Sequence, residues 1–263
     1  MSQPVRTERR GALLEITIDR PKANAFDDVT SKALGEALVA YQADDALRCA
    51  IITGAGDKFF SGGWDLKFAA KVGRGEAKVD YGPGGFAGTT ELWSLTKPVI
   101  AALNGLTVGG GWELALACDM VVAAEHVKFW MPEVQRGIIA DGGGVLRLPR
   151  LLPYPVAMEI LLTSRWVEVQ EMVPYGLVNA VVPAHALMDR ARAMAEPILA
   201  AAPLAVRATK ATWHATSHLS VPEAYAKVRR GEIPDHVRML ESDDFLEGPR
   251  AFAEGRTPVF KGR

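Results

Sequence analysis

The chain has 263 residues, of which 49% are hydrophobic and 23% charged. This length and composition predict a globular protein with one large domain, or a domain with an appended module. Lys and Arg number 30 and Asp and Glu 31, which gives a formal net charge of −1. That balance argues against a nucleic-acid binder, which usually carries a basic excess. Because no apolar stretch reaches the roughly 18 residues of a transmembrane helix, no membrane contact is expected either.

The cysteine content indicates the redox environment. Only Cys49 and Cys118 are present, and both lie in apolar surroundings. They predict buried thiols in a reducing compartment rather than a disulfide. The first ten residues are polar and lack the apolar core of a signal peptide. We therefore expect a cytoplasmic protein.

Strands and helices alternate through the first two-thirds of the chain. Short runs of apolar and β-branched residues predict strands at 13–19, 49–53, 97–103 and 120–124. Apolar residues at helical spacing predict helices over 28–43 and 113–118. This alternation favours an α/β fold with largely parallel strand pairing.

The chain changes character past about Gly176. From there we expect only helices, over 186–201, 203–217 and 222–230. These helices predict a C-terminal helical segment packed on the α/β core. Within the alternating part, the glycine-rich stretch 72–88 predicts a long loop, and loops of that length are usually functional or disordered.

The segment 104–117 carries the main functional signal. Gly109, Gly110 and Gly111 come directly before a predicted helix, where glycine lets the backbone approach a ligand closely. The first N–H groups of a helix have no intrahelical partner and lie at the positive end of its dipole. They can bind an anion, or an oxygen that becomes one in a transition state. Glu113 places a carboxylate beside these donors, although a tight turn alone would also explain the glycines.

Two further segments strengthen this interpretation. The loop 59–67 again places glycines, Gly62 and Gly63, before an expected helix. A second carboxylate, that of Glu133, follows an apolar strand in a segment that ends with three glycines at 142–144. A single glutamate is more often solvated or ion-paired, so only the joint occurrence of these features points to catalysis.

Together these segments resemble the crotonase (enoyl-CoA hydratase/isomerase) superfamily, and the likeness covers nearly the whole chain. The segments that carry it are 20–25 (RPKANA), 60–66 (FSGGWDL), 109–113 (GGGWE) and 248–254 (GPRAFAE). The resemblance implies a superhelix of ββα units over residues 1–195 and a C-terminal helical trimerisation region over 196–263. It also implies a homo-oligomer, either a trimer or a dimer of trimers, that acts on an acyl-CoA substrate.

The resemblance also implies a mechanism. It assigns an oxyanion hole for the thioester oxygen to the backbone N–H groups of Trp64 and Gly110, and backbone donors tolerate any side chain at these positions. Glu113 and Glu133 fall on the two catalytic glutamates, of which one activates water while the other, protonated, supplies the α-proton. The expected reaction is reversible hydration of a 2-enoyl-CoA. Coenzyme A enters as the substrate thioester, and no cofactor or metal is expected because no zinc-ligand spacing or dinucleotide motif is present.

Several details resemble the branch of the superfamily whose members dehydrate carnitinyl-CoA. They are Trp64 and the segments 81–88, 143–149 and 257–263. Aromatic rings near the proposed site, including Tyr81 and Phe86, would attract a trimethylammonium group by cation–π interaction. The expected substrate-binding residues are Lys22, Ala25, Asp65, Leu66, Trp112, Trp130 and Asp141.

Two departures from the family pattern leave alternatives open. Asp141 stands where typical hydratases carry glycine, whereas dienoyl-CoA isomerases have an aspartate there, so double-bond isomerisation with Asp141 is the rival reaction. A simple turn residue is the other interpretation of Asp141. Gly255 replaces a lysine that relatives use toward the coenzyme A phosphates, which leaves Lys22, Arg256 and Lys261 as candidates. A non-catalytic family member is the rival class, and the two glutamates argue against it.

Overall fold

The computed structural model describes residues 3–73 and 79–263. Of the loop predicted over 72–88, residues 74–78 lie outside the described part. The remainder of that loop contains a short 3-10 helix, η2 (Phe86–Gly88). This helix contacts α1, so this part of the loop lies on the body of the protein.

The larger of two sheets has six strands. In spatial order they are β1 (Val5–Arg10), β2 (Leu13–Ile18), β3 (Cys49–Gly54), β5 (Val99–Leu103), β7 (Met120–Ala124) and β10 (Ala180–Val182). All neighbouring pairs are parallel except β1 with β2. The parallel α/β architecture predicted from the sequence is therefore confirmed.

The smaller sheet arises from a repeat in the chain. Its strands, in order, are β4 (Phe59–Ser61), β6 (Leu106–Val108), β8 (Lys128–Trp130) and β9 (Val167–Glu168). Three times, a strand of the large sheet is followed by one of the small sheet and then by a helix: β3–β4–α2, β5–β6–α3 and β7–β8–η3. Because β4, β6 and β8 are parallel, the loops after them lie at one edge of the small sheet.

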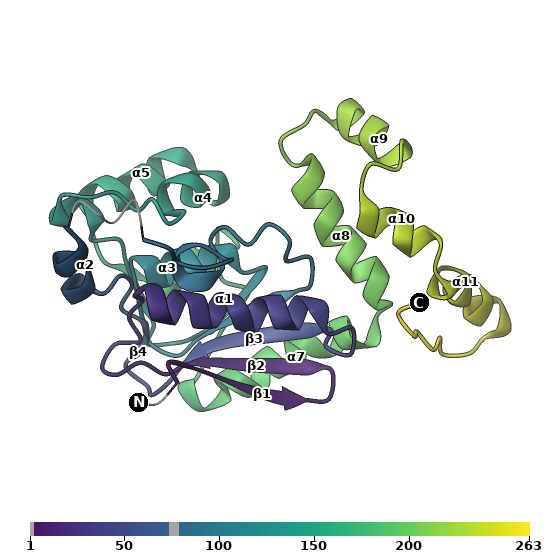
Figure 1. Cartoon of the computed structure of the whole chain (residues 1–263), viewed down its shortest axis with the longest axis horizontal. Helices are drawn as coiled ribbons and strands as arrows, with labels where there is room; N and C mark the ends of the chain where they lie inside the picture. The colour runs from purple at the N-terminus through teal and green to yellow at the C-terminus, as the bar shows by residue number, and fades with distance from the viewer. Residues whose placement is uncertain (1–2, 74–78) are drawn as a thin grey trace.

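Helices cover both faces of the large sheet (Figure 1). On one face lies α1 (Asp28–Ala43), which begins where the Asp27 carboxylate accepts a hydrogen bond from the Thr30 N–H and which buries residues at helical spacing. On the other face lies α7 (Leu187–Ala200), whose buried alanines and Leu187 pack against alternate residues of the strands. The remaining elements of the α/β part are α2 (Leu66–Val72), α3 (Gly110–Ala117), η3 (Glu133–Arg136), α4 (Gly144–Leu151), α5 (Tyr154–Thr163), α6 (Val169–Met172) and η4 (Ala184–Ala186).

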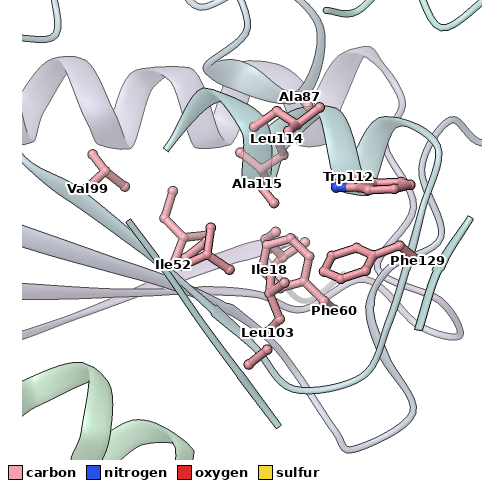
Figure 2. Packing of buried hydrophobic residues seen from close by; sticks show 14 of the residues in the cluster. Ile18, Ile52, Phe60, Ala87, Val99, Leu103, Trp112, Leu114, Ala115 and Phe129 are labelled. Carbon is pink, nitrogen blue, oxygen red and sulfur yellow. The ribbon is translucent and has the colours of Figure 1, made fainter. Parts of the chain in front are cut away.

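The main hydrophobic core lies between the two sheets, α1 and α3. Figure 2 shows Ile18 and Ile52 of the large sheet beside Phe60 of the small sheet, with Leu114 and Ala115 of α3 above them. All of these residues are buried. Since α3 is anchored on both sheets, its first turn is held firmly at the edge where the strands of the small sheet end.

The last four helices extend away from the sheets as an arm (Figure 1). They are α8 (Pro203–Thr216), α9 (Val221–Arg229), α10 (Pro234–Leu240) and α11 (Asp243–Glu254). The domain boundary expected at residue 196 falls inside α7, which packs on the sheet. The arm itself begins at α8.

In the large sheet, two strands were not expected. β1 is polar and only its first residue is buried, and it pairs with β2 across a turn at Gly11. The other, β10, follows Gly176, where only helices were predicted, and lies parallel to β7. The prediction of a C-terminal part without strands is therefore wrong at this position, because three half-buried residues give too short a pattern to indicate a strand.

Candidate active site

The loops that follow β4 and β6 are in direct contact. A Cβ added to Gly63 would lie 2.5 Å from the Val108 carbonyl oxygen and 2.7 Å from the Gly110 nitrogen. Gly63 also has a φ of +78°, a conformation that glycine adopts without strain. Only glycine therefore allows the backbones before Trp64 and Gly110 to lie this close together.

The first turn of α3 presents free backbone donors. Gly109 has a φ of +50° and its carbonyl accepts hydrogen bonds from the N–H groups of Trp112 and Glu113, which starts the helix at Gly110. The helix thus begins three residues earlier than the sequence indicated. Within the described residues the Gly110 N–H donates to no protein acceptor. It is an orphan donor at the positive end of an eight-residue helix.

A single β-bridge orients the second donor. The Phe26 N–H donates to the Gly63 carbonyl at 2.7 Å, and the Asp65 N–H donates to the Phe26 carbonyl at 2.8 Å. Because a trans peptide directs its C=O and N–H oppositely, the Trp64 N–H points away from Phe26. Like that of Gly110, it has no protein acceptor among the residues that the structure describes. The two donors predicted for an oxyanion hole therefore both remain available to a ligand.

Glu113 lies one helical turn into α3 and is 3% exposed. Its Oε1 accepts a hydrogen bond of 2.8 Å from the N–H of Gly144, and Gly144 is the first residue of α4. Burial raises the pKa of Glu113 to about 8, opposed by the Gly144 hydrogen bond and reinforced by the charges of Glu133 and Asp141. A carboxyl group of this kind holds a proton near neutral pH.

Glu133 is the first residue of η3, directly after β8 and Pro132. A Cβ on Gly109 would lie 2.5 Å from its Oε1, so the carboxylate lies against the glycine turn that starts α3. Its Oε2 is buried and, among the described residues, without a hydrogen-bond partner. Burial, together with the charge of Asp141, raises the pKa of Glu133 to about 7. An unsatisfied buried oxygen of this kind indicates that a ligand or water belongs beside it.

The two glutamates are coupled electrostatically. Each has a raised pKa, and the charge of Glu133 contributes to the shift of Glu113. Since ionising both would place two negative charges in a buried site, the first carboxyl to ionise makes ionisation of the second less favourable. One carboxyl is then an acid while the other is a base, the arrangement needed to move two protons in opposite senses.

Glu113→Gln should stabilise the fold more at high pH than at low pH. The folded-state pKa lies above the ordinary value, so the contribution of Glu113 is fully present below about pH 4.5 and is lost as the pH rises through about 8. Glutamine does not titrate, and the variant should gain on the order of a few kcal/mol relative to the unsubstituted protein between pH 5 and 9. Urea unfolding at both pH values measures this, with exposed Glu125→Gln as control. An equal difference at both pH values would contradict the raised pKa.

Phe86 closes one side of the pair. A Cβ on Gly110 would collide with the Phe86 ring, and one on Gly142 would lie 2.9 Å from that ring and 2.6 Å from Glu113 Oε2. The ring of Tyr81 meets Phe86 edge to face at 5.5 Å. Phe86 therefore lies at the site, with Tyr81 packed against it.

The three expected tryptophans lie in different environments. Trp112 is fully buried and stacks on Phe129 at 4.6 Å, so its ring is packed into the core (Figure 2). Trp130 contributes its backbone, because its carbonyl accepts a 2.7 Å hydrogen bond from the Gly109 N–H. The Trp130 indole stacks on Trp166 at 4.7 Å and donates to the Ser164 carbonyl. Trp64 remains half-buried, with an indole N–H that lacks a partner among the described residues.

The other expected substrate-binding residues divide into two groups. Lys22 and Leu66 are exposed, and Asp141 is an exposed residue whose charge acts on both glutamates. Ala25 and Asp65 have protein partners instead, because both accept hydrogen bonds from Arg20. Asp65 also caps α2 through the N–H groups of residues 67 and 68, so its carboxylate is engaged within the fold.

Two residues of the site were not singled out from the sequence. The Gly144 N–H holds Glu113, and the glycines at 142–144 before α4 repeat the signal of Gly109–Gly111, so the same argument would have found it. Arg147 donates to the Thr90 carbonyl at 2.7 Å, and Thr90 in turn donates to the Phe86 carbonyl at 2.7 Å. No sequence signal connects residues so far apart.

The described residues contain neither a metal-binding cluster nor a membrane-spanning helix. In residues 3–73 and 79–263, no three His, Cys, Asp or Glu side chains gather so that they could hold a metal ion. In the same ranges no helix combines the length and apolarity needed to cross a membrane. The expectation that the reaction needs no metal or cofactor stays a prediction.

Comparisons with known proteins agree with this geometry. The model of the enoyl-CoA hydratase/isomerase family matches residues 8–263. A carnitinyl-CoA dehydratase of Salmonella paratyphi A is 52% identical over 264 residues, covering 100% of both chains. A solved enoyl-CoA hydratase of Mycobacterium marinum superposes with a TM-score of 0.89 at 41% identity, and a carnitinyl-CoA hydratase of Mycobacterium avium with 0.75 at 42%, each covering 100% of both chains. The chain belongs to the enoyl-CoA hydratase/isomerase family.

Proposed function

We propose that this protein catalyses the reversible addition of water to the double bond of an enoyl-CoA thioester. The observation that carries the proposal is the pair of buried glutamates, Glu113 and Glu133, beside two unengaged backbone N–H groups. Family membership, which makes the chain an acyl-CoA-processing lyase, supports it. The thioester is the only form in which coenzyme A takes part.

Each step of this reaction has a candidate group in the site. As hydroxide from water adds to the β-carbon, negative charge develops on the thioester oxygen, and the N–H groups of Trp64 and Gly110 donate to it. The ionised glutamate takes a proton from the water, and the protonated one gives a proton to the α-carbon. The pair holds one proton before and after turnover, so the reverse reaction uses the same groups.

The finer part of the proposal is an acyl chain that ends in a trimethylammonium group, as in crotonobetainyl-CoA and carnitinyl-CoA. Three carboxylates lie in or beside the site, those of Glu113, Glu133 and Asp141, and they favour a cationic substrate. The rings of Phe86 and Tyr81 offer aromatic faces to the same group. The name of the Salmonella relative points to the same substrate.

Crotonobetainyl-CoA should be hydrated with a kcat/KM at least about tenfold above that of crotonyl-CoA, because one or two cation–π contacts and a nearby carboxylate together contribute about 1–3 kcal/mol. Asp141→Asn should lower this ratio by roughly three- to tenfold, as it removes one charge of the site. The matched control is Asp57→Asn, which removes an exposed carboxylate from the turn between β3 and β4. Equal kcat/KM for both substrates would contradict the trimethylammonium assignment and leave the hydration reaction standing.

Isomerisation through Asp141 is the second candidate, because the charge of Asp141 acts on both glutamates. The two reactions differ in their products, since isomerisation of a 3-enoyl-CoA takes up no water. We expect water addition to exceed double-bond migration. The reverse order, together with loss of migration in Asp141→Asn, would establish the isomerase.

The proposal includes a homo-oligomer formed through the arm, a trimer or a dimer of trimers. The arm presents large apolar side chains to solvent, a usual mark of a protein interface. They are Trp213, Val221, Tyr225, Leu246 and Phe252.

For the coenzyme A phosphates, Lys22 and Lys261 are the better candidates, since Arg256 is bound to Glu247 and Glu254.

The two free cysteines agree with the cytoplasm predicted from the sequence.

A further inference from the structure

Arg20 lies between the two loops that frame the Trp64 donor. Its Nη2 donates to Asp27 at 2.9 Å and to Asp65 at 2.5 Å, and its Nη1 donates to the Ala25 carbonyl at 3.1 Å. The arginine side chain is 26% exposed and each aspartate 17%. Partly buried contacts of a guanidinium with carboxylates are stronger and better defined in direction than surface ion pairs.

The partners of Arg20 fix the ends of two helices. The Asp27 carboxylate caps α1, and the Asp65 carboxylate caps α2 through the Lys67 N–H at 2.8 Å. Although burial acts to raise it, the Arg20 hydrogen bond lowers the pKa of Asp65. The two carboxylates share one guanidinium, so the two helix starts are tied together.

The β-bridge that orients the Trp64 N–H lies between these two carboxylates in the chain. Phe26 directly precedes Asp27, and Trp64 directly precedes Asp65. Without Arg20, two partly buried anions would face each other with no cation between them and would push their loops apart. The bridge has only two hydrogen bonds, so a small separation of the loops would turn the Gly63–Trp64 peptide and its N–H.

We propose that Arg20 is a positioning residue for catalysis, which holds the Trp64 N–H in the direction of the thioester oxygen by clamping Asp27 to Asp65. The inference rests on the proposed oxyanion hole. Arg20 itself does not contact the reacting atoms. It fixes the direction of one donor, the Trp64 N–H, and loss of that direction would lower the polarisation of the bound thioester.

The test compares Arg20→Gln with Asp65→Asn. Asparagine still caps a helix as well as aspartate does, so Asp65→Asn removes the ion pair and leaves the start of α2 intact. Losing one oxyanion donor lowers kcat by about 10²–10³, and misplacing it should lower kcat by about ten- to a hundredfold at saturating enoyl-CoA. Arg20→Lys, which keeps the charge and one donor, should recover part of this loss.

A spectroscopic readout separates positioning from stability. A 3-aryl-acryloyl-CoA bound at saturation should absorb at longer wavelength than when free, because hydrogen bonds to its carbonyl polarise the conjugated chain. The shift should shrink in Arg20→Gln and Asp65→Asn. The matched control is Arg192→Gln, which removes the bidentate pair of 2.7 and 3.0 Å with Glu15 on the opposite side of the sheet and should retain the full shift.

The results of this test separate the role of Arg20 from the proposed oxyanion hole. Lowered kcat and a reduced shift in both Arg20→Gln and Asp65→Asn, with Arg192→Gln unchanged, support the clamp. An undiminished shift in either folded variant overturns the clamp and leaves the oxyanion hole standing. If Arg20→Gln does not fold, Asp65→Asn decides alone. No shift with the unsubstituted protein would overturn the oxyanion hole itself.

Discussion

Glu113→Gln and Glu133→Gln should each lower kcat for hydration of crotonyl-CoA by about 10³-fold or more. General acid–base catalysis contributes about 10²–10⁴ per group, and each replacement also deprives the other glutamate of its proton partner. The KM should change little, since neither carboxylate is expected to bind coenzyme A. Steady-state kinetics at pH 7.5 measure the effect.

Glutamine conserves shape at both positions, which makes the loss specific to proton transfer. At residue 113 its amide oxygen can still accept the Gly144 hydrogen bond. The double variant should be little worse than either single one, because groups that act as a unit show non-additive losses. Glu125→Gln, an exposed residue after β7, is the control. Near-normal turnover in both single variants would exclude the proposed mechanism.

Much of the α/β framework followed from the sequence. The helix Asp28–Ala43 and the strand Met120–Ala124 have the predicted bounds, because a clear apolar period and sharp polar ends mark them. The family resemblance, rather than any pattern of predicted strands, linked Glu113 with Glu133, and the structure places the two close enough for the charge of Glu133 to act on Glu113. Their catalytic roles remain a proposal.

The direction of the Trp112 ring could not be predicted. Every residue of α3 from Gly110 to Leu116 is buried, so the helix has no polar face from which the inward side could be deduced. The sequence does not indicate the contacts of Arg20 either. Its partner Asp65 lies 45 positions away, and long-range contacts such as the pairing of Phe26 with Trp64 bring the two together.

Gly63→Ala should lower kcat by about 10²-fold or more, although the residue has no side chain and no reacting group. A methyl group at this position would lie 2.5 Å from the Val108 carbonyl and 2.7 Å from the Gly110 nitrogen, so the two loops must separate. Both proposed donors, on Trp64 and Gly110, would then move off the thioester oxygen, and one lost donor alone is worth about 10²–10³.

Gly176→Ala is the matched control for this prediction. Gly176 has a φ of +73°, against +78° for Gly63, but a Cβ there would meet nothing within 4 Å. Gly176→Ala should therefore lower the free energy of unfolding by roughly 1–2 kcal/mol of backbone strain. Gly63→Ala should lower it further, because its two loops must also separate. Only Gly63→Ala should also lose kcat and the long-wavelength shift of a bound 3-aryl-acryloyl-CoA. If the two variants lost activity equally, the loss would come from strain, and the close contact of the two loops would have no part in catalysis.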